Sequence, residues 1–210
     1  MFEVEYLNGE KNGKGKEYYK ESKIKFEGIY KNDRRWNGIG YDINNKIIYE
    51  IKEGKGYIYE YNNVGKLQFE GEYLYGIKNG KGKEYDNGIL IFEGEYMNGK
   101  KSGIGKEYNK KEMIFEGRYL YDNEIRGRFY AYNELEFEWE YLFNKKWNGN
   151  GYDAKGNIIY TLINGNGKVK EYFYLSNSLK YDVEMINGNF SKGKEYYNNG
   201  NLKYEGEFSN

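Results

Sequence analysis

A phrase with a period near 23 residues recurs along the whole chain and constrains its fold more than any other feature. The best copies are FEGEYLYGIKNGKGKEY at residues 69–85 and FEGEYMNGKKSGIGKEY at residues 92–108. Successive copies open with an aromatic residue 20 to 24 positions after the last, which gives nine full units and a stub. The opening aromatics are Phe2, Phe26, Tyr49, Phe69, Phe92, Phe115, Phe137, Tyr160, Tyr181 and Tyr204. A period of this length predicts a repeat architecture in which each unit packs on its neighbours.

Each unit has the pattern of one antiparallel β-hairpin. Phe92, Gly94 and Tyr96 alternate with two glutamates, and alternation with period two predicts a strand. Asn98-Gly99 then supplies a tight turn, because Asn and Gly adopt positive φ at low cost. A return strand of the form Gly-x-Gly-x-x-Tyr follows. No stretch shows a helical period, so we expect an all-β fold: an elongated, twisted, single-layer antiparallel sheet of about nine consecutive β-hairpins, solenoid-like in organisation.

The glycines inside the return strands need a packing reason. Glycine in a strand offers no side chain to pack and marks the close approach of another group. We expect Gly80 and Gly82 to share one face of their strand and to form a slot that Phe and Tyr rings of adjacent strands fill. Large flat rings suit a sheet of one layer, because each ring buries more area than an aliphatic side chain does.

A second, longer period is also present. WNGIGYD at residues 36–42 reappears as WNGNGYD at residues 147–153, an offset of 111. The run Ile-Ile-Tyr at residues 47–49 returns at the same offset. We interpret residues 1–210 as a single continuous repeat array with an internal five-repeat duplication, residues 1–114 and 115–210. No Pro- or Ser-rich linker interrupts the array.

Composition excludes several classes of function. The 210 residues contain no Cys and no His, which removes thiolate metal sites, the usual general base and the commonest metal ligand. Thirty-three basic and 33 acidic residues cancel, so the charge does not favour nucleic acid. No apolar run is long enough for a membrane span, and no signal peptide is visible. We therefore expect a cytoplasmic protein.

The phrases Phe-Glu-Gly-Glu-Tyr, Asn-Gly and Gly-x-Gly-x-x-Tyr at this period resemble the MORN repeat (membrane occupation and recognition nexus). The resemblance covers essentially the whole chain and is weakest in the units after Tyr49 and Tyr160. It implies an all-MORN array with one hairpin per repeat. It also implies a scaffold that binds other proteins or forms homo-oligomers, with membrane-proximal association in several family members. No enzymatic activity is implied, because no catalytic domain accompanies the repeats.

A hydrolase would need a pair of carboxylates, and only repeated glutamates offer one. They precede a repeat tyrosine at Glu17, Glu84, Glu107, Glu171 and Glu195. A residue copied into five repeats more simply serves the repeat, by pairing with Lys or by accepting a Tyr hydroxyl, since catalysis depends on one singular geometry. We assign no catalytic residue, no cofactor and no metal ligand.

Singular residues are better candidates for binding. Trp36 and Trp147 occupy equivalent turns and follow basic pairs, Arg34-Arg35 in the first case. Trp with Arg is typical of binding hot spots, although each Trp could instead cover its own turn. A stripe of repeat tyrosines forms a second candidate surface: Tyr73, Tyr96, Tyr119 and Tyr141.

The sequence therefore predicts a non-catalytic scaffold. It would bind a protein partner, or assemble with itself, through the aromatic sheet face or through open edge strands such as residues 204–208. Two alternatives remain: a ligand-binding module whose aromatic slots hold a glycan or a lipid headgroup, and an antitoxin-like repeat protein.

Overall fold

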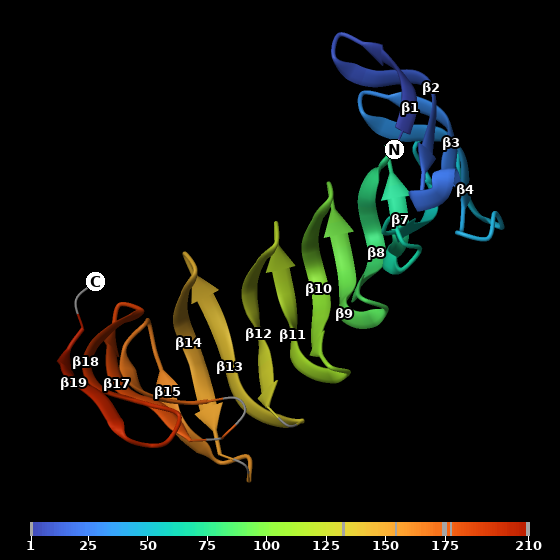
Figure 1. Ribbon diagram of the computed structural model, residues 1–210. Coiled ribbons are helices and arrows are strands. Elements are labelled where there is room, and N and C mark those ends of the chain that lie inside the picture. Colours follow the sequence, from blue (N-terminus) through green and yellow to red (C-terminus); the bar gives the residue numbers. More distant parts are fainter. Residues whose placement is uncertain (1, 132, 154, 174–175, 177, 209–210) are drawn as a thin grey trace. The chain divides into compact units, whose positions relative to one another are not determined.

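The computed structural model describes residues 2–131, 133–153, 155–173, 176 and 178–208, and this part of the chain is all-β (Figure 1). Nineteen strands of the described residues lie in three open antiparallel sheets, and within each sheet strands that are consecutive in the sequence pair with one another, so the predicted all-β hairpin fold is confirmed. The one helical segment among the described residues is a 3-10 turn at Lys20–Ser22.

The chain divides into two compact units. The first consists of Met1–Lys111 with Leu120–Asp122, and the second of Glu112–Tyr119 with Asn123–Asn210. The strands of the first unit are β1 (Phe2–Leu7), β2 (Glu10–Tyr18), β3 (Ile24–Lys31), β4 (Arg34–Tyr41), β5 (Ile47–Ile51), β6 (Gly56–Tyr61), β7 (Leu67–Leu74), β8 (Ile77–Asp86), β9 (Ile89–Met97) and β10 (Lys100–Asn109). Strands β1 to β5 form one sheet in sequence order, and β6 to β10 follow one another in the same way.

The second unit repeats this organisation. Its strands are β11 (Glu112–Leu120), β12 (Asn123–Ala131), β13 (Glu134–Leu142), β14 (Lys145–Tyr152), β15 (Ile158–Leu162), β16 (Gly167–Tyr172), β17 (Leu179–Ile186), β18 (Asn189–Tyr196) and β19 (Leu202–Glu207). Strands β11 to β15 are neighbours in sequence order, and β16 to β19 form a separate sheet.

The hairpin of β9 and β10 shows why these residues turn where they do. Asn98 and Gly99 have φ values of +51° and +84°, the left-handed pair that a two-residue hairpin turn requires. Phe92 and Tyr96 are 1% and 5% exposed on one face of β9. The predicted turn is confirmed, and Phe92 and Tyr96 share one face of β9 as the alternation predicts.

Phenylalanine rings fill glycine slots, as the sequence predicts for the second glycine of each pair. A Cβ atom added at Gly82 would lie 2.7 Å from Cζ of Phe69 and 3.1 Å from Cε2 of Tyr96. The same ring of Phe69 packs edge-to-face against Tyr73, with centroids 6.0 Å apart and planes at 71°. The pairs Phe26–Tyr30, Phe92–Tyr96 and Phe115–Tyr119 have the same arrangement.

The first glycine of the pair has a different role, and the prediction that Gly80 lines the ring slot is wrong. The pairing of β7 with β8 shifts register after Gly71, and Gly80 has a φ of +103° within the resulting bulge. The Glu72 carboxylate accepts a hydrogen bond from the backbone N–H of Lys81 at 3.1 Å. A Cβ atom at Gly80 would lie 1.9 Å from Oε2 of Glu72. Glycine is therefore required because a carboxylate, and not a ring, fills this space.

Aliphatic residues replace the rings where the sheet of each unit breaks. Consecutive strands β5 and β6 belong to different sheets, and so do β15 and β16. Ile51 and Ile58 are each 1% exposed at the first break, and Leu162 and Val169 are 1% and 0% exposed at the second. These are the short units at the 111-residue offset, so the two breaks occur at equivalent places in the repeat.

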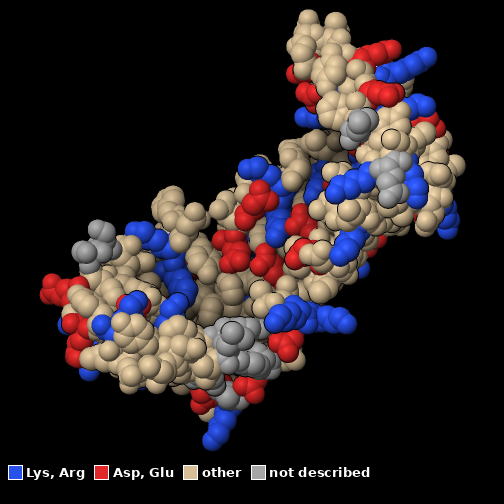
Figure 2. All heavy atoms as spheres, in the orientation of Figure 1, with Lys and Arg blue, Asp and Glu red and all other residues tan. Residues whose placement is uncertain are grey.

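The opposite sheet face is polar and internally paired. The tyrosine that ends a return strand donates its hydroxyl to the glutamate of the neighbouring strand, for example Tyr85 to Glu70 at 2.7 Å and Tyr108 to Glu93 at 2.6 Å. Cross-strand ion pairs lie beside these bonds, for example Lys16 with Glu27 at 3.5 Å. Figure 2 shows acidic and basic side chains adjacent to one another on the visible surface.

We predict that Gly82→Ala lowers the free energy of unfolding by about 1–3 kcal/mol, because the added methyl group overpacks the ring of Phe69. Chemical denaturation of the full chain measures the change. The control is Lys81→Ala, at an exposed position on the same strand, which should change stability by less than about 0.5 kcal/mol. Equal effects of the two substitutions would contradict the conclusion that the Phe69 ring fills the space beside Gly82.

Candidate functional site

A basic side chain covers the phenylalanine ring in the regular repeats. Nζ of Lys78 lies 3.9 Å from the ring centroid of Phe69 and 3.4 Å from Oε1 of Glu84. Lys101 has the same relation to Phe92 and Glu107, at 4.0 Å and 3.1 Å. A cation above an aromatic face is attractive, and its aliphatic stem adds apolar cover.

The repeated glutamates therefore have structural partners. Five of them pair with a basic residue: Glu17 with Arg35, Glu84 with Lys78, Glu107 with Lys101, Glu171 with Lys146 and Glu195 with Lys203. This arrangement agrees with the interpretation that they serve the repeat.

Arg35 forms the most elaborate of these pairs. Its guanidinium lies 5.0 Å from the Phe26 centroid and donates to both carboxylate oxygens of Glu17, at 3.0 Å and 2.5 Å. The same group donates to the Tyr49 hydroxyl at 3.0 Å, and the Tyr30 hydroxyl donates to Glu17 at 2.6 Å. Burial alone would raise the pKa of Glu17, but the Arg35 charge and these hydrogen bonds outweigh it and lower that pKa to about 2.

The sequence explains why Arg35 reaches back to the preceding hairpin. In the regular repeat Phe69 is paired with Glu84, whereas Phe26 is paired with Gly40. The ring of Tyr49 occupies the space beside Gly40, 2.0 Å from where a Cβ atom would be. Arg35 therefore has no glutamate on its own return strand.

A cavity of about 350 Å³ opens beside this cluster in the first unit. Among the residues that line it are the predicted site residues Arg34, Arg35 and Tyr73, together with the buried Ile51 and Ile58 of the sheet break. The rest of the lining is Lys11, Glu17, Tyr30, Asp33, Glu60, Gly76, Ile77, Lys78 and Gly99. The cavity thus has an apolar floor and charged walls.

The structure places the other predicted site residues elsewhere. Tyr96 and Tyr119 are only 5% and 4% exposed, so these members of the stripe lie within the ring core. Tyr141 and both Trp36 and Trp147 are half-buried.

The two turn tryptophans have local contacts. Nζ of Lys31 lies 4.7 Å from the Trp36 ring. A Cβ atom at Gly165 would lie 2.9 Å from Trp147. Both observations suit rings that cover a turn.

Sequence reasoning missed the hairpin tip beside the cavity. Tyr75 directly precedes the lining residue Gly76, is 60% exposed and has a φ of +53°. The Arg34 guanidinium donates to its carbonyl oxygen at 3.4 Å. Bulky residues rarely adopt this left-handed conformation, and the corresponding position in other turns is asparagine, as at Asn98. A tyrosine at a turn position that elsewhere holds asparagine was the sequence signal that could have identified this tip. Tyr121 and Phe143 share the feature, with φ values of +50° and +48°.

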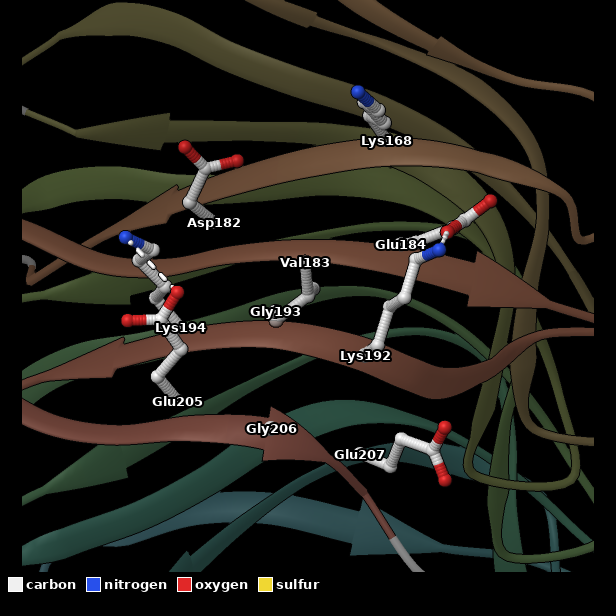
Figure 3. Close-up of a pocket in the computed structure, with 10 residues that line it drawn as sticks. All are labelled: Lys168, Asp182, Val183, Glu184, Lys192, Gly193, Lys194, Glu205, Gly206 and Glu207. Atoms are coloured by element: carbon white, nitrogen blue, oxygen red, sulfur yellow. Dashed lines mark ion pairs between the residues drawn. The ribbon is translucent and has the colours of Figure 1, made fainter.

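A second hollow, of about 460 Å³, lies on the polar face of the sheet formed by β16 to β19 (Figure 3). Gly193 and Gly206 form its floor, and acidic and basic side chains stand around it. Lys192 pairs with Glu184 and Lys194 with Glu205, each at 3.2 Å. These four side chains already form ion pairs with one another, so the hollow resembles the rest of the solvated polar face.

Comparison with protein families agrees with the repeat geometry. A sequence profile of the MORN repeat matches residues 5–22, 69–89 and 92–110, so the chain carries MORN repeats. Each matched segment contains a glutamate that caps a glycine bulge: Glu5 at Gly13, Glu72 at Gly80 and Glu95 at Gly103. MORN repeats are generally modules of protein or membrane interaction and generally lack enzymatic activity. A search of curated proteins found no match.

The described residues lack two further features. They contain no cluster of three or more acidic side chains placed to hold a metal ion. Among them, no helix is long and apolar enough to cross a membrane.

We predict that the Glu17–Arg35 pair makes the free energy of unfolding depend on pH in the acid range. The pKa of Glu17 falls from near 4.3 in the unfolded chain to about 2 in the fold, so its contribution of about 3 kcal/mol is complete above pH 5 and is lost as the pH falls to 2. Denaturation midpoints of the native chain and Glu17→Gln should therefore converge between pH 5 and 2. A Glu17→Gln difference that stays constant between pH 5 and 2 would contradict the pairing.

We also predict that Tyr75→Asn stabilises the chain by about 0.5–1 kcal/mol, because asparagine tolerates the left-handed conformation and Tyr75 buries little area. The reverse change, Asn98→Tyr, should destabilise it by a similar amount. Denaturant titration of both variants measures the two effects. Loss of stability in Tyr75→Asn would show that the ring is held by packing.

Proposed function

We propose that the chain is a non-catalytic interaction scaffold that binds a protein partner at the cavity of its first unit. The surface consists of the cavity and its rim, with Arg34 and Tyr75 as the exposed contacts and Ile51, Ile58 and Tyr73 as the interior. This is the finer form of the interaction role that MORN repeats generally have.

The proposal rests on the left-handed conformation and the exposed side chain of Tyr75 at the tip of its hairpin. An exposed ring in a left-handed turn is unfavourable both for the backbone and for hydration, and such features concentrate at functional sites. Tyrosine and arginine are the residues most enriched at binding hot spots. The cavity volume of about 350 Å³ is within the range of ligand pockets and accepts one or two side chains.

The other predictions made from the sequence are also proposals. We place the chain in the cytoplasm as one repeat array derived by duplication, without a nucleic-acid partner. Self-assembly through an edge strand is the alternative mode, since β1 pairs only with β2 and β19 only with β18 among the described strands. The glycan or lipid-headgroup alternative is less favoured, because the chain's own rings occupy the slots, such as the one at Gly82. An antitoxin-like role is the third proposal, as one form of the general scaffold.

The test is a selection of random displayed peptides against the full chain. We predict that the selected peptides bind Tyr75→Asn and Arg34→Ala at least tenfold more weakly, as expected for hot-spot residues. The matched control is Phe143→Asn, which changes an equivalent turn in the other unit and should leave affinity unchanged.

Two results would overturn the proposal. Peptides that bind every variant equally would place the interaction elsewhere, and failure to select any peptide would remove the evidence for a docking surface. Light scattering over a concentration series tests the alternative: a mass that doubles in the native chain and in Tyr75→Asn alike would favour assembly through an edge strand.

A further inference from the structure

One glutamate in the repeat series lacks, among the described residues, the ion pair that its equivalents form. Glu60 precedes a repeat tyrosine and is paired with Phe69 in the β-ladder, as Glu17 is with Phe26 and Glu84 with Phe92. Its equivalents each form an ion pair. Glu60 accepts a hydrogen bond from the Tyr73 hydroxyl at 2.8 Å, and no described basic residue forms an ion pair with it.

The short repeat unit explains the missing partner. The covering cation stands nine positions after the opening aromatic, as Lys78 does after Phe69 and Arg35 after Phe26. Nine positions after Tyr49 the chain has Ile58, which is 1% exposed in the core of the sheet break. The same shortening in the second unit leaves Glu171 in this role, but Lys146 pairs with it there.

The described cations around the cavity form no ion pair with Glu60. Arg35 pairs with Glu17, and Lys78 pairs with Glu84. Nζ of Lys11 lies 4.3 Å from the Phe2 ring. The exposed Arg34 contacts the Tyr75 carbonyl. Outside the lining, the ammonium of Lys25 donates to the carbonyl of Tyr61 and interacts with Glu60 through space.

The remaining charges of the lining are of both signs, Lys11 and Arg34 beside Asp33 and Glu60. Asp33 accepts a hydrogen bond from the backbone of Lys11 at 2.9 Å. Glu60 likewise accepts one hydrogen bond, from the Tyr73 hydroxyl, and Glu17 is the carboxylate of the lining that forms an ion pair among the described residues.

We infer that the cavity receives a lysine or arginine side chain of a protein partner, which pairs with Glu60 beside the Tyr73 ring. This inference rests on the proposed partner-binding role of the same surface. The chain itself supplies the template, since a basic residue combines with a glutamate and an aromatic ring at Lys78, Lys101 and Arg35. Ile51 and Ile58 would contact the aliphatic stem of the incoming side chain.

The peptide selection also tests this inference. We expect the selected peptides to share one Lys or Arg, and replacing that residue by norleucine should weaken binding at least tenfold, as should Glu60→Gln in the chain. Glutamine keeps an acceptor for the Tyr73 hydroxyl, so the fold should persist. The matched control is Glu107→Gln, which removes an equivalent charge remote from the cavity lining and should leave affinity unchanged.

The outcomes separate this inference from the proposed function. Peptides that depend on Tyr75 and Arg34 but carry no shared basic residue, or bind Glu60→Gln normally, would overturn the inference and leave the docking surface intact. Shared acidic residues would instead indicate that Arg34 and Lys11 bind an anion, which also overturns it. Peptides insensitive to Tyr75→Asn and Arg34→Ala would overturn both.

Discussion

The packing of a phenylalanine ring against the bare backbone of glycine is the interaction on which each regular hairpin depends. A sheet of this kind has no second layer to cover its apolar face, so the ring must be covered from within the repeat. Lys78 above Phe69, paired with Glu84, provides that cover. Three contributions stabilise this arrangement. The ring buries apolar area, the cation is attracted to the aromatic face, and the ion pair with the glutamate positions the cation.

Because these groups interact with one another, the regular repeats leave few groups available to bind a partner. Aromatic rings fill their glycine slots, their glutamates form ion pairs with cations, and their tyrosine hydroxyls donate hydrogen bonds to neighbouring carboxylates. The pairing of charges changes where a repeat departs from the pattern. Gly40 replaces a glutamate and redirects Arg35 to Glu17. Ile58 replaces a cation, and Glu60 accepts a hydrogen bond from Tyr73 in place of an ion pair with a described residue. The cavity lies at this departure, which is why we propose it as the docking surface.

Sequence reasoning recovered what depends on local pattern. Alternation predicted the strands, Asn98-Gly99 predicted the turn, and strand glycine predicted the slot at Gly82. Gly80 was assigned to the wrong role because a bulge shifts the register, and alternation continues unchanged through the letters of the sequence. The stripe of tyrosines was assigned to an exposed surface because periodicity identifies a shared face but not how far neighbours cover it, and Tyr96 proved to be 5% exposed.

The sequence by itself determined the hairpins, their number and the ring core, because strand alternation and turn preference act over a few residues and are copied with each repeat. Only the tertiary structure decided which charges meet. Glu60 and Glu171 occupy equivalent places at the 111-residue offset, yet Lys146 forms an ion pair with Glu171 and no described cation forms one with Glu60. That difference depends on which side chains meet in the fold, because Arg35, the equivalent of Lys146, pairs with Glu17 instead.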